Sequence, residues 1–155
     1  SGRRDSLRAV NAVVNKPVKD TARPVVVNSA FDFVPTSPQF VAMLLNKVDP
    51  VYASEARNAF TRYNHEKFSQ QNIEIVKEVI DKDKSLLIFR QFTEAASAVT
   101  YFTKIKKDAV MESSWLPTNK YSFFIISDPN LQLLKVTKDV QSYLKVLHSS
   151  MPDKF

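Results

Sequence analysis

The two histidines are the side chains of this chain best suited to proton transfer or metal binding. His65 and His148 are far apart in the sequence, and neither has a second ligand at the spacing that metal sites use. Both are expected near the end of a helix, where the negative end of the helix dipole favours a histidine. We therefore interpret both as solvated helix-end residues rather than as metal ligands or catalytic bases.

Two pairs of carboxylates are the next candidates for acid–base chemistry or calcium binding. Glu74 and Glu78 share one face of an expected strand, where a rise of about 3.3 Å per residue separates them by about 13 Å. Glycosidases hold their carboxylates about 5–9.5 Å apart. Asp81 and Asp83 lack the other oxygen ligands and the turn glycine of a calcium loop, so we interpret them as the polar tip of a hairpin.

The usage of glycine and cysteine excludes several further kinds of site, because the chain has one glycine, Gly2, and no cysteine. Phosphate-cradling loops, dinucleotide fingerprints, nucleophile elbows and EF-hand loops need glycine where the backbone approaches a ligand or takes a positive φ. Disulfides, thiolate metal sites and thiol nucleophiles need cysteine. A Ser-His-Asp arrangement assembled in space stays open, but nothing marks a particular serine. The sequence therefore predicts no cofactor, no metal and no catalytic residues, and hence no enzyme.

Net charge is the feature that would favour nucleic acid as a partner. The total is +6, but residues 1–24 hold six basic and two acidic residues, which leaves only +2 for residues 25–155. The remaining charges are interspersed, as in Lys82-Asp83-Lys84, and form no stripe that could follow a phosphate backbone. We therefore expect a solvated charged surface and no specific nucleic acid.

The chain length of 155 residues fits one domain with a real core. Ser1-Gly2 resembles the remnant of a removed tag, and residues 3–24 are basic, poor in aromatics and without a sustained period. We therefore predict a tag remnant and basic linker over residues 1–24 and a single domain over residues 25–155.

The first half of this domain predicts a strand, a helix and a hairpin. The apolar run 40–47, bounded by proline, is typical of a buried strand. Asp49 and Pro50 form a good helix start, so a helix is predicted over 50–68. Strands are predicted over 73–80 and 86–92. The apolar stripe of the helix is expected to contain Tyr52, Ala56, Ala59, Phe60 and Tyr63.

The second half predicts a helix, a loop and a strong strand, followed by a C-terminal helix. Thr93 is expected to cap a helix that continues past Ile105, and residues 109–120 are expected to form a loop. A strand is predicted over 121–127, and residues 131–136 are interpreted as extended. The last helix is expected to begin at a Thr137 N-cap and to end near Ser149.

This order of elements, βαββαβ, predicts an α+β domain of the ferredoxin-like type. Such a domain has a four-stranded antiparallel sheet with two helices on one face, and here an extra C-terminal helix follows. The strands 40–47 and 121–127 are apolar at both odd and even positions, so we expect both faces of the sheet to be covered. The C-terminal helix and residues 25–33 are the available covers for the second face.

The ferredoxin-like plan also occurs in sheet-based binding modules, namely RNA recognition motifs for nucleic acid and SPOR domains for cell-wall glycan. RNA recognition motifs present aromatic residues on an open sheet face. The third predicted strand offers one candidate, Phe89, for which we expect core packing instead. Such a ligand-binding module is the alternative function.

A protein partner is expected near the last strand of the predicted sheet. This strand lies at a sheet edge and carries no charge between Tyr121 and Ser127, so it must be paired by residues 131–136 or by a partner. The adjoining loop supplies Trp115, an aromatic residue of the kind that dominates interfaces. The predicted partner-binding residues are therefore Trp115, Leu116, Tyr121 and Phe123.

Several phrases of the sequence resemble one family. Residues 25–155 are similar to the C-terminal region of the tetratricopeptide-repeat lipoproteins of the type IX secretion and gliding-motility machinery of Bacteroidota, the SprE/PorW family. The similar phrases are Phe31-Asp32-Phe33-Val34-Pro35, Ala59-Phe60-Thr61-Arg62-Tyr63-Asn64, Trp115-Leu116-Pro117, Lys120-Tyr121-Ser122-Phe123-Phe124-Ile125-Ile126-Ser127 and Pro152-Asp153-Lys154-Phe155.

This resemblance implies a non-catalytic protein-interaction domain in a cell-envelope secretion and gliding apparatus. It implies a periplasmic location and an outer-membrane lipoprotein whose lipid anchor lies outside residues 1–155. The membrane is then contacted only through that anchor, and the expected partner is another protein of the assembly.

Overall fold

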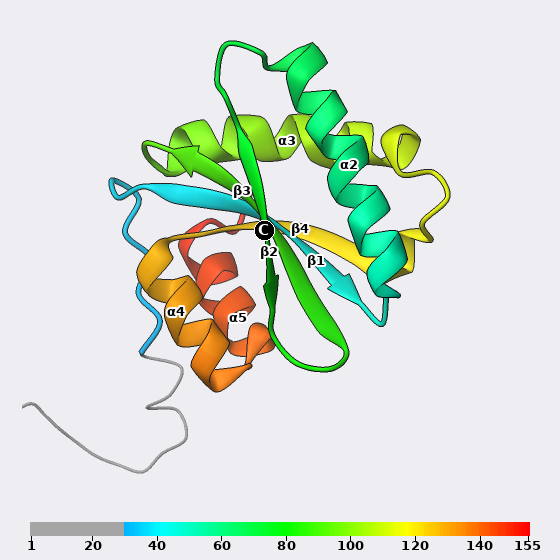
Figure 1. Cartoon of the computed structure of the whole chain (residues 1–155). Coiled ribbons are helices and arrows are strands. Elements are labelled where there is room, and N and C mark those ends of the chain that lie inside the picture. Colours follow the sequence, from blue (N-terminus) through cyan, green and yellow to red (C-terminus); the bar gives the residue numbers. More distant parts are fainter. Residues whose placement is uncertain (1–29) are drawn as a thin grey trace, which may run out of the picture. The chain divides into compact units, whose positions relative to one another are not determined.

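The computed structural model describes residues 30–155, in which residues Phe33–Phe155 form one compact unit (Figure 1). The predicted linker, residues 1–24, and residues 25–29 lie outside the described part of the chain. Along the chain the elements are β1 (Gln39–Asn46), α2 (Pro50–Lys67), β2 (Glu74–Val79), β3 (Lys84–Phe92), α3 (Ala95–Glu112), the 3-10 turn η1 (Thr118–Lys120), β4 (Tyr121–Ile126), α4 (Asp128–Thr137) and α5 (Val140–Ser150).

The four strands form an antiparallel sheet in the order β2-β3-β1-β4. The central strand β1 pairs with both neighbours, so that Ala42 lies opposite Ile88 of β3 and opposite Phe124 of β4. This is the strand order of the ferredoxin-like βαββαβ fold, with β2 and β4 at the edges. The predicted fold class is confirmed.

Helices cover both faces of the sheet, with α2 and α3 on one side and α4 and α5 on the other (Figure 1). On the first face Phe60 of α2 packs edge-on against Phe89, with 5.9 Å between the ring centroids. On the second face the ring of Tyr143 in α5 lies 5.8 Å from that of Phe124. The Tyr143 hydroxyl also donates a 2.6 Å hydrogen bond to the Ile125 carbonyl of β4. The expectation that an apolar second face must be covered is therefore confirmed.

The start of α2 follows the predicted chemistry, and the start of α3 does not. The Asp49 side chain accepts a hydrogen bond of 2.8 Å from the Val51 backbone amide, and Pro50 begins the helix. In α3 the predicted cap Thr93 is wrong, because Glu94 is the N-cap and exchanges hydrogen bonds with Ser97 in a capping box. The helix also continues to Glu112, so the predicted loop over 109–120 begins later than expected.

The extended interpretation of residues 131–136 is wrong, because they lie within α4. The Ser127 hydroxyl accepts a hydrogen bond from the Asn130 backbone amide, and a proline occupies the first turn. Both features favour the start of a helix. Leu131 and Leu134, three residues apart, are then buried on one face. The second face is therefore covered by two helices where one was predicted.

The predicted N-cap of the last helix is also wrong. Thr137 is the final residue of α4, and the chain reverses at Lys138, whose φ is 59°. Asp139 caps α5 instead, because its carboxylate accepts a hydrogen bond of 3.0 Å from the Ser142 backbone amide. A hydrogen bond from the Ser142 hydroxyl, followed by the bond from the Ser142 amide, lowers the pKa of Asp139. Among the helices over residues 30–155, none is long and apolar enough to cross a membrane.

Candidate functional site

The loop between α3 and η1 holds Trp115 at the surface. Ser113 is buried, and both its hydroxyl and its amide donate to the Ala109 carbonyl at 2.9 Å. The Leu116 amide then donates to the Ser113 carbonyl at 2.9 Å, and the Leu116 side chain is buried. These bonds fix the turn on both sides of Trp115, whose side chain stays 45% exposed.

Trp115 contacts a second exposed aromatic residue, Tyr52, in the first turn of α2. Their ring centroids are 6.1 Å apart, the rings are tilted by 35°, and Tyr52 is 55% exposed. Figure 1 shows the loop after α3 passing beside the beginning of α2. Two segments that are far apart in the sequence thus present their aromatic rings together.

Further exposed large hydrophobic side chains occur in the segments of the chain that carry or precede these two rings. Eight such side chains occur among residues 30–155, and five of them belong to the start of α2, the end of α3 and the loop that follows. Isolated exposed hydrophobic residues are ordinary, whereas a group of them marks a contact surface. We refer to these five as the aromatic corner, which consists of Val51, Tyr52, Val110, Met111 and Trp115.

The four residues predicted to bind a partner do not share one surface. Trp115 is exposed and Tyr121 is half-buried, with its ring 5.9 Å from that of Phe123. Leu116 and Phe123 point into the core, where Phe123 packs against Phe60 at 6.3 Å. A partner at this end of the domain would therefore contact Trp115 directly, while Leu116 and Phe123 hold the loop and strand that support it.

Tyr52 is the residue of this surface that sequence reasoning assigned to the core stripe of α2. The buried stripe of the helix runs instead through Ala53, Ala56 and Phe60. Its neighbour Val51 is also exposed, so the first turn presents two adjacent apolar side chains to solvent. Tyr52 precedes the buried residue Ala56 by four positions, so the helical spacing alone gave no signal that it would be exposed.

The outer edge of β4 does not pair with residues 131–136. Within the described residues β1 is the only strand that pairs with β4. A cavity beside it, lined in part by Ser122, Phe124 and Leu144, is bordered by Phe102 of α3 and Phe155. These two rings lie 4.7 Å apart, so the edge is flanked by packed side chains.

The carboxylates selected from the sequence are engaged in local contacts. Glu74 pairs with Arg90 of β3 at 3.3 Å, and Glu78 pairs with Lys135 of α4 at 3.0 Å. Asp81 accepts hydrogen bonds of 2.8 Å from the Asp83 and Lys84 amides, which close the hairpin and lower the pKa of Asp81. No group of at least three histidine, aspartate or glutamate side chains within residues 30–155 is arranged to hold a metal ion.

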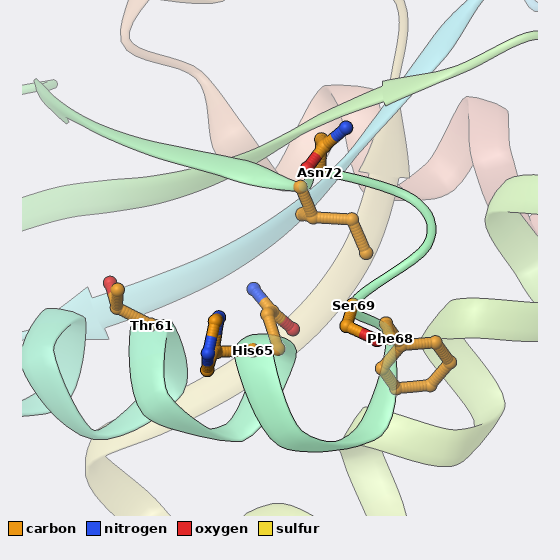
Figure 2. Close-up of a pocket in the computed structure, with 7 residues that line it drawn as sticks. Thr61, His65, Phe68, Ser69 and Asn72 are labelled. Carbon is orange, nitrogen blue, oxygen red and sulfur yellow. The ribbon is translucent and has the colours of Figure 1, made fainter.

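A second concave site lies where α2 ends and the chain turns toward β2 (Figure 2). It is a pocket of about 180 Å³ lined by Thr61, Asn64, His65, Phe68, Ser69, Asn72 and Ile73. The predicted helix-end histidine His65 is on its wall. His148 is elsewhere, with its Nδ1 atom 2.8 Å from the Phe155 carbonyl oxygen.

A polar contact between α2 and α3 lies near this pocket. The buried Tyr63 hydroxyl donates a 2.6 Å hydrogen bond to Asp108 Oδ2, and Lys104 lies 3.4 Å from the same oxygen. The hydrogen bond from Tyr63 lowers the pKa of Asp108. Burial, followed by the bond to Asp108, raises the pKa of Tyr63. The contact ties the two helices of the first face together.

Comparison of the chain with protein-family models, with curated protein sequences and with solved structures found no match. The functional argument therefore rests on the residues of the chain and their arrangement.

Proposed function

We propose that this domain is a non-catalytic protein-interaction module and that the aromatic corner is its contact surface. The observation that carries the proposal is the contact between Tyr52 and Trp115, two exposed aromatic rings from segments that are far apart in the sequence. Tryptophan and tyrosine are the residues most enriched at the energetic centres of protein interfaces.

The area that a partner could cover gives the expected strength of these two anchors. An aromatic side chain buries about 150–250 Å². Because Trp115 and Tyr52 are 45% and 55% exposed, roughly 100 Å² of each remains to be covered. At about 25 cal/mol per Å² this is worth about 2–3 kcal/mol for each ring.

The covered sheet favours a protein partner over the alternative of a nucleic acid or a cell-wall glycan. Binding through an open sheet needs exposed aromatic rings on one face. Here Phe89 is fully buried against α2 and α3, and the opposite face lies under α4 and α5. The two most exposed aromatic rings of residues 30–155, Tyr52 and Trp115, contact each other at the start of α2 and in the loop after α3, away from the sheet faces.

The proposed setting is a cell-envelope secretion and gliding assembly in the periplasm. The resemblance of residues 25–155 to the lipoproteins of that machinery supports this setting. In this proposal the membrane is reached only through a lipid anchor outside residues 1–155, and the partner is another protein of the assembly.

The first prediction concerns capture of this partner. A photoreactive amino acid at position 115 should crosslink the domain to a specific envelope protein in the source cells, and the same amino acid at position 136 should not. With that protein purified, calorimetry should show that Trp115→Ala and Tyr52→Ala each weaken binding by about 2 kcal/mol, roughly 30-fold. Trp115→Ala should leave the unfolding midpoint nearly unchanged.

Val136→Ala is the matched control, because Val136 is 78% exposed on α4, outside the aromatic corner. Equal binding by all three variants would contradict the proposal. If Trp115→Ala lost much stability but still bound the partner as before, Trp115 would be shown to be a core residue. Submicromolar binding of single-stranded RNA or DNA at physiological salt by residues 25–155 would favour the alternative function.

A further inference from the structure

A hollow of about 280 Å³ lies along the outer edge of β4. It is lined by Phe102 of α3, by residues 122–124 of β4 and by Leu144 of α5, together with residues of the C-terminal segment. Because α3 and α5 cover opposite faces of the sheet, a hollow that both helices line lies at the sheet edge and not on a face (Figure 1). Three consecutive strand residues in the lining agree with this, since their side chains alternate between the faces.

A second hollow of about 500 Å³ adjoins the first. Its lining consists of Phe102, Thr103, Lys106, Lys107, Asp153 and Lys154. Three of these residues, Phe102, Lys106 and Lys154, also line the first hollow, so the two hollows are continuous with each other. We refer to the two hollows together as the edge groove. None of its lining residues belongs to the aromatic corner.

The C-terminal segment that borders the edge groove is held in place by several contacts. The backbone amides of Lys154 and Phe155 both donate to the Met151 carbonyl at 3.0 Å. The Phe155 ring lies 4.7 Å from the Phe102 ring, and the Phe155 carbonyl oxygen lies 2.8 Å from His148 Nδ1. A groove with preformed walls binds a ligand at a lower cost in conformational entropy.

The edge groove has apolar surface that a ligand can reach. Phe155 and Leu144 are half-buried, and Ser122 between them and the strand edge is exposed. The other aromatic rings of the lining are almost fully buried, with at most 8% exposure for Phe102, Phe123 and Phe124. An apolar side chain of a ligand would therefore contact Phe155 and Leu144.

Three lysines give the edge groove a positive charge. Lys106, Lys107 and Lys154 are exposed, and none of them forms an ion pair with another of residues 30–155. The lining contains one acidic residue, Asp153, so its net charge is +2. The Lys106 Nζ atom lies 5.5 Å from the centre of the Phe102 ring, which places this charge where the two hollows meet. Such a surface complements carboxylates that stand beside an apolar group.

A protein segment fits this combination better than a nucleic acid does. Single-stranded nucleic acids bind through phosphates and through bases that stack on accessible aromatic rings. Among the aromatic rings of the edge groove, Phe155 alone is more than 8% exposed. A polypeptide can place apolar and acidic side chains at neighbouring positions, and two adjoining hollows suit a chain of several residues.

We propose that the edge groove binds a short acidic segment of a protein partner. An apolar side chain of this segment lies against Phe155 and Leu144, and neighbouring carboxylates pair with Lys106 and Lys154. The proposal does not rest on the function proposed for the aromatic corner. Its test reads different residues, so either proposal can fail while the other stands.

NMR titration of the full-length, ¹⁵N-labelled protein tests this assignment at low ionic strength, where exposed charges are least screened. The probe is a short end-capped peptide in which one phenylalanine is flanked on each side by two aspartates. The backbone amides of Lys106, Ser122 and Lys154 should shift and saturate, while that of Val136 stays in place. Because residues 1–24 are also basic, the affinity is taken from the groove amides and not from total binding.

Two control peptides separate the two parts of the recognition without any change to the protein. The first has asparagine in place of each aspartate, and the second has alanine in place of the phenylalanine. Each should bind about five-fold more weakly or worse, because one loses the ion pairs and the other loses the apolar contact.

A matched pair of double variants separates the edge groove from the net charge of the protein. Lys106→Gln/Lys154→Gln should weaken binding of the acidic peptide by about five-fold or more. Lys47→Gln/Lys82→Gln removes the same charge from exposed lysines outside the groove and should bind nearly as tightly as the original protein. All four positions are exposed, so both variants should fold.

Several results would overturn the proposal. Groove amides that show no saturating shift would do so, as would a control peptide that binds as tightly as the acidic peptide. Equal affinities of the two double variants would show that only the net charge matters. Single-stranded DNA or phosphatidylglycerol vesicles that shift the groove amides at lower concentration than the peptide would identify a nucleic acid or a membrane surface as the occupant instead.

Discussion

At the scale of single residues, the hydrogen bond from Tyr63 to Asp108 is the contact whose strength depends on pH. The Asp108 carboxylate accepts this bond at 2.6 Å, and its pKa lies below the usual value as a result. A carboxyl group with a lowered folded-state pKa stabilises the protein above the unfolded pKa of about 3.9. That stabilisation is lost as the pH falls through the folded pKa.

We therefore predict that Tyr63→Phe lowers the free energy of unfolding by about 1–2 kcal/mol at pH 7. At an acidic pH below the folded-state pKa of Asp108 the difference from the original protein should be smaller, because the carboxyl group is then protonated in both. Urea denaturation at the two pH values measures this. Tyr52→Phe is the control, because it removes a hydroxyl from an exposed ring and should have little effect on stability at either pH. If the effect of Tyr63→Phe on stability did not change with pH, the explanation would be refuted.

Single residues were predictable where local spacing decides their environment. Phe89 was expected in the core because it follows the apolar run Leu86-Leu87-Ile88, and it is fully buried. Asn64 was not recognised as a buried residue, although it follows Phe60 by four residues and so shares the buried face of α2. Its Oδ1 atom accepts a hydrogen bond from the hydroxyl of Tyr101, which the sequence alone does not place beside it.

At the scale of elements, α4 is the segment whose apolar residues are compatible with the periodicity of a strand and with that of a helix. In the segment Leu131-Gln132-Leu133-Leu134-Lys135-Val136, apolar residues fit both a strand and a helix. A strand would place Leu134 and Val136 on the same face. In the helix they point in different directions, so Leu134 is fully buried and Val136 is 78% exposed.

This difference gives a matched pair of substitutions. Leu134→Ala should cost about 2–5 kcal/mol of stability, since it opens a cavity under the sheet. Val136→Ala should stay within about 0.5 kcal/mol. Chemical denaturation of both variants provides the measurement, and equal losses would indicate that the two side chains share one buried face.

Helix starts were predictable from the sequence only where the capping residue has no local competitor. Asp49 precedes Pro50 and was assigned correctly. Near α5, Thr137 and Asp139 are both good caps, and the choice depends on α4, which occupies the chain up to Thr137. Such choices require knowing which segment covers the second face of the sheet.

At the scale of the whole molecule, the sheet order and the coverage of both faces followed from the sequence. Strands that are apolar at odd and even positions need cover on two sides, and the structure supplies it with two pairs of helices. The aromatic corner did not follow, because it joins the start of α2 to the loop after α3. Only the folded chain brings Tyr52 beside Trp115.

The central claim, that the aromatic corner binds a protein partner, can be tested with the single tryptophan of the chain. In the ¹⁵N-labelled protein its indole N–H gives one NMR signal, which an unlabelled partner cannot obscure. When the crosslinked envelope protein is added, this signal should shift or broaden in step with binding, while the amide signal of Val136 on α4 stays in place. An indole signal that does not change while calorimetry records binding would contradict the claim and place the interface elsewhere on the domain.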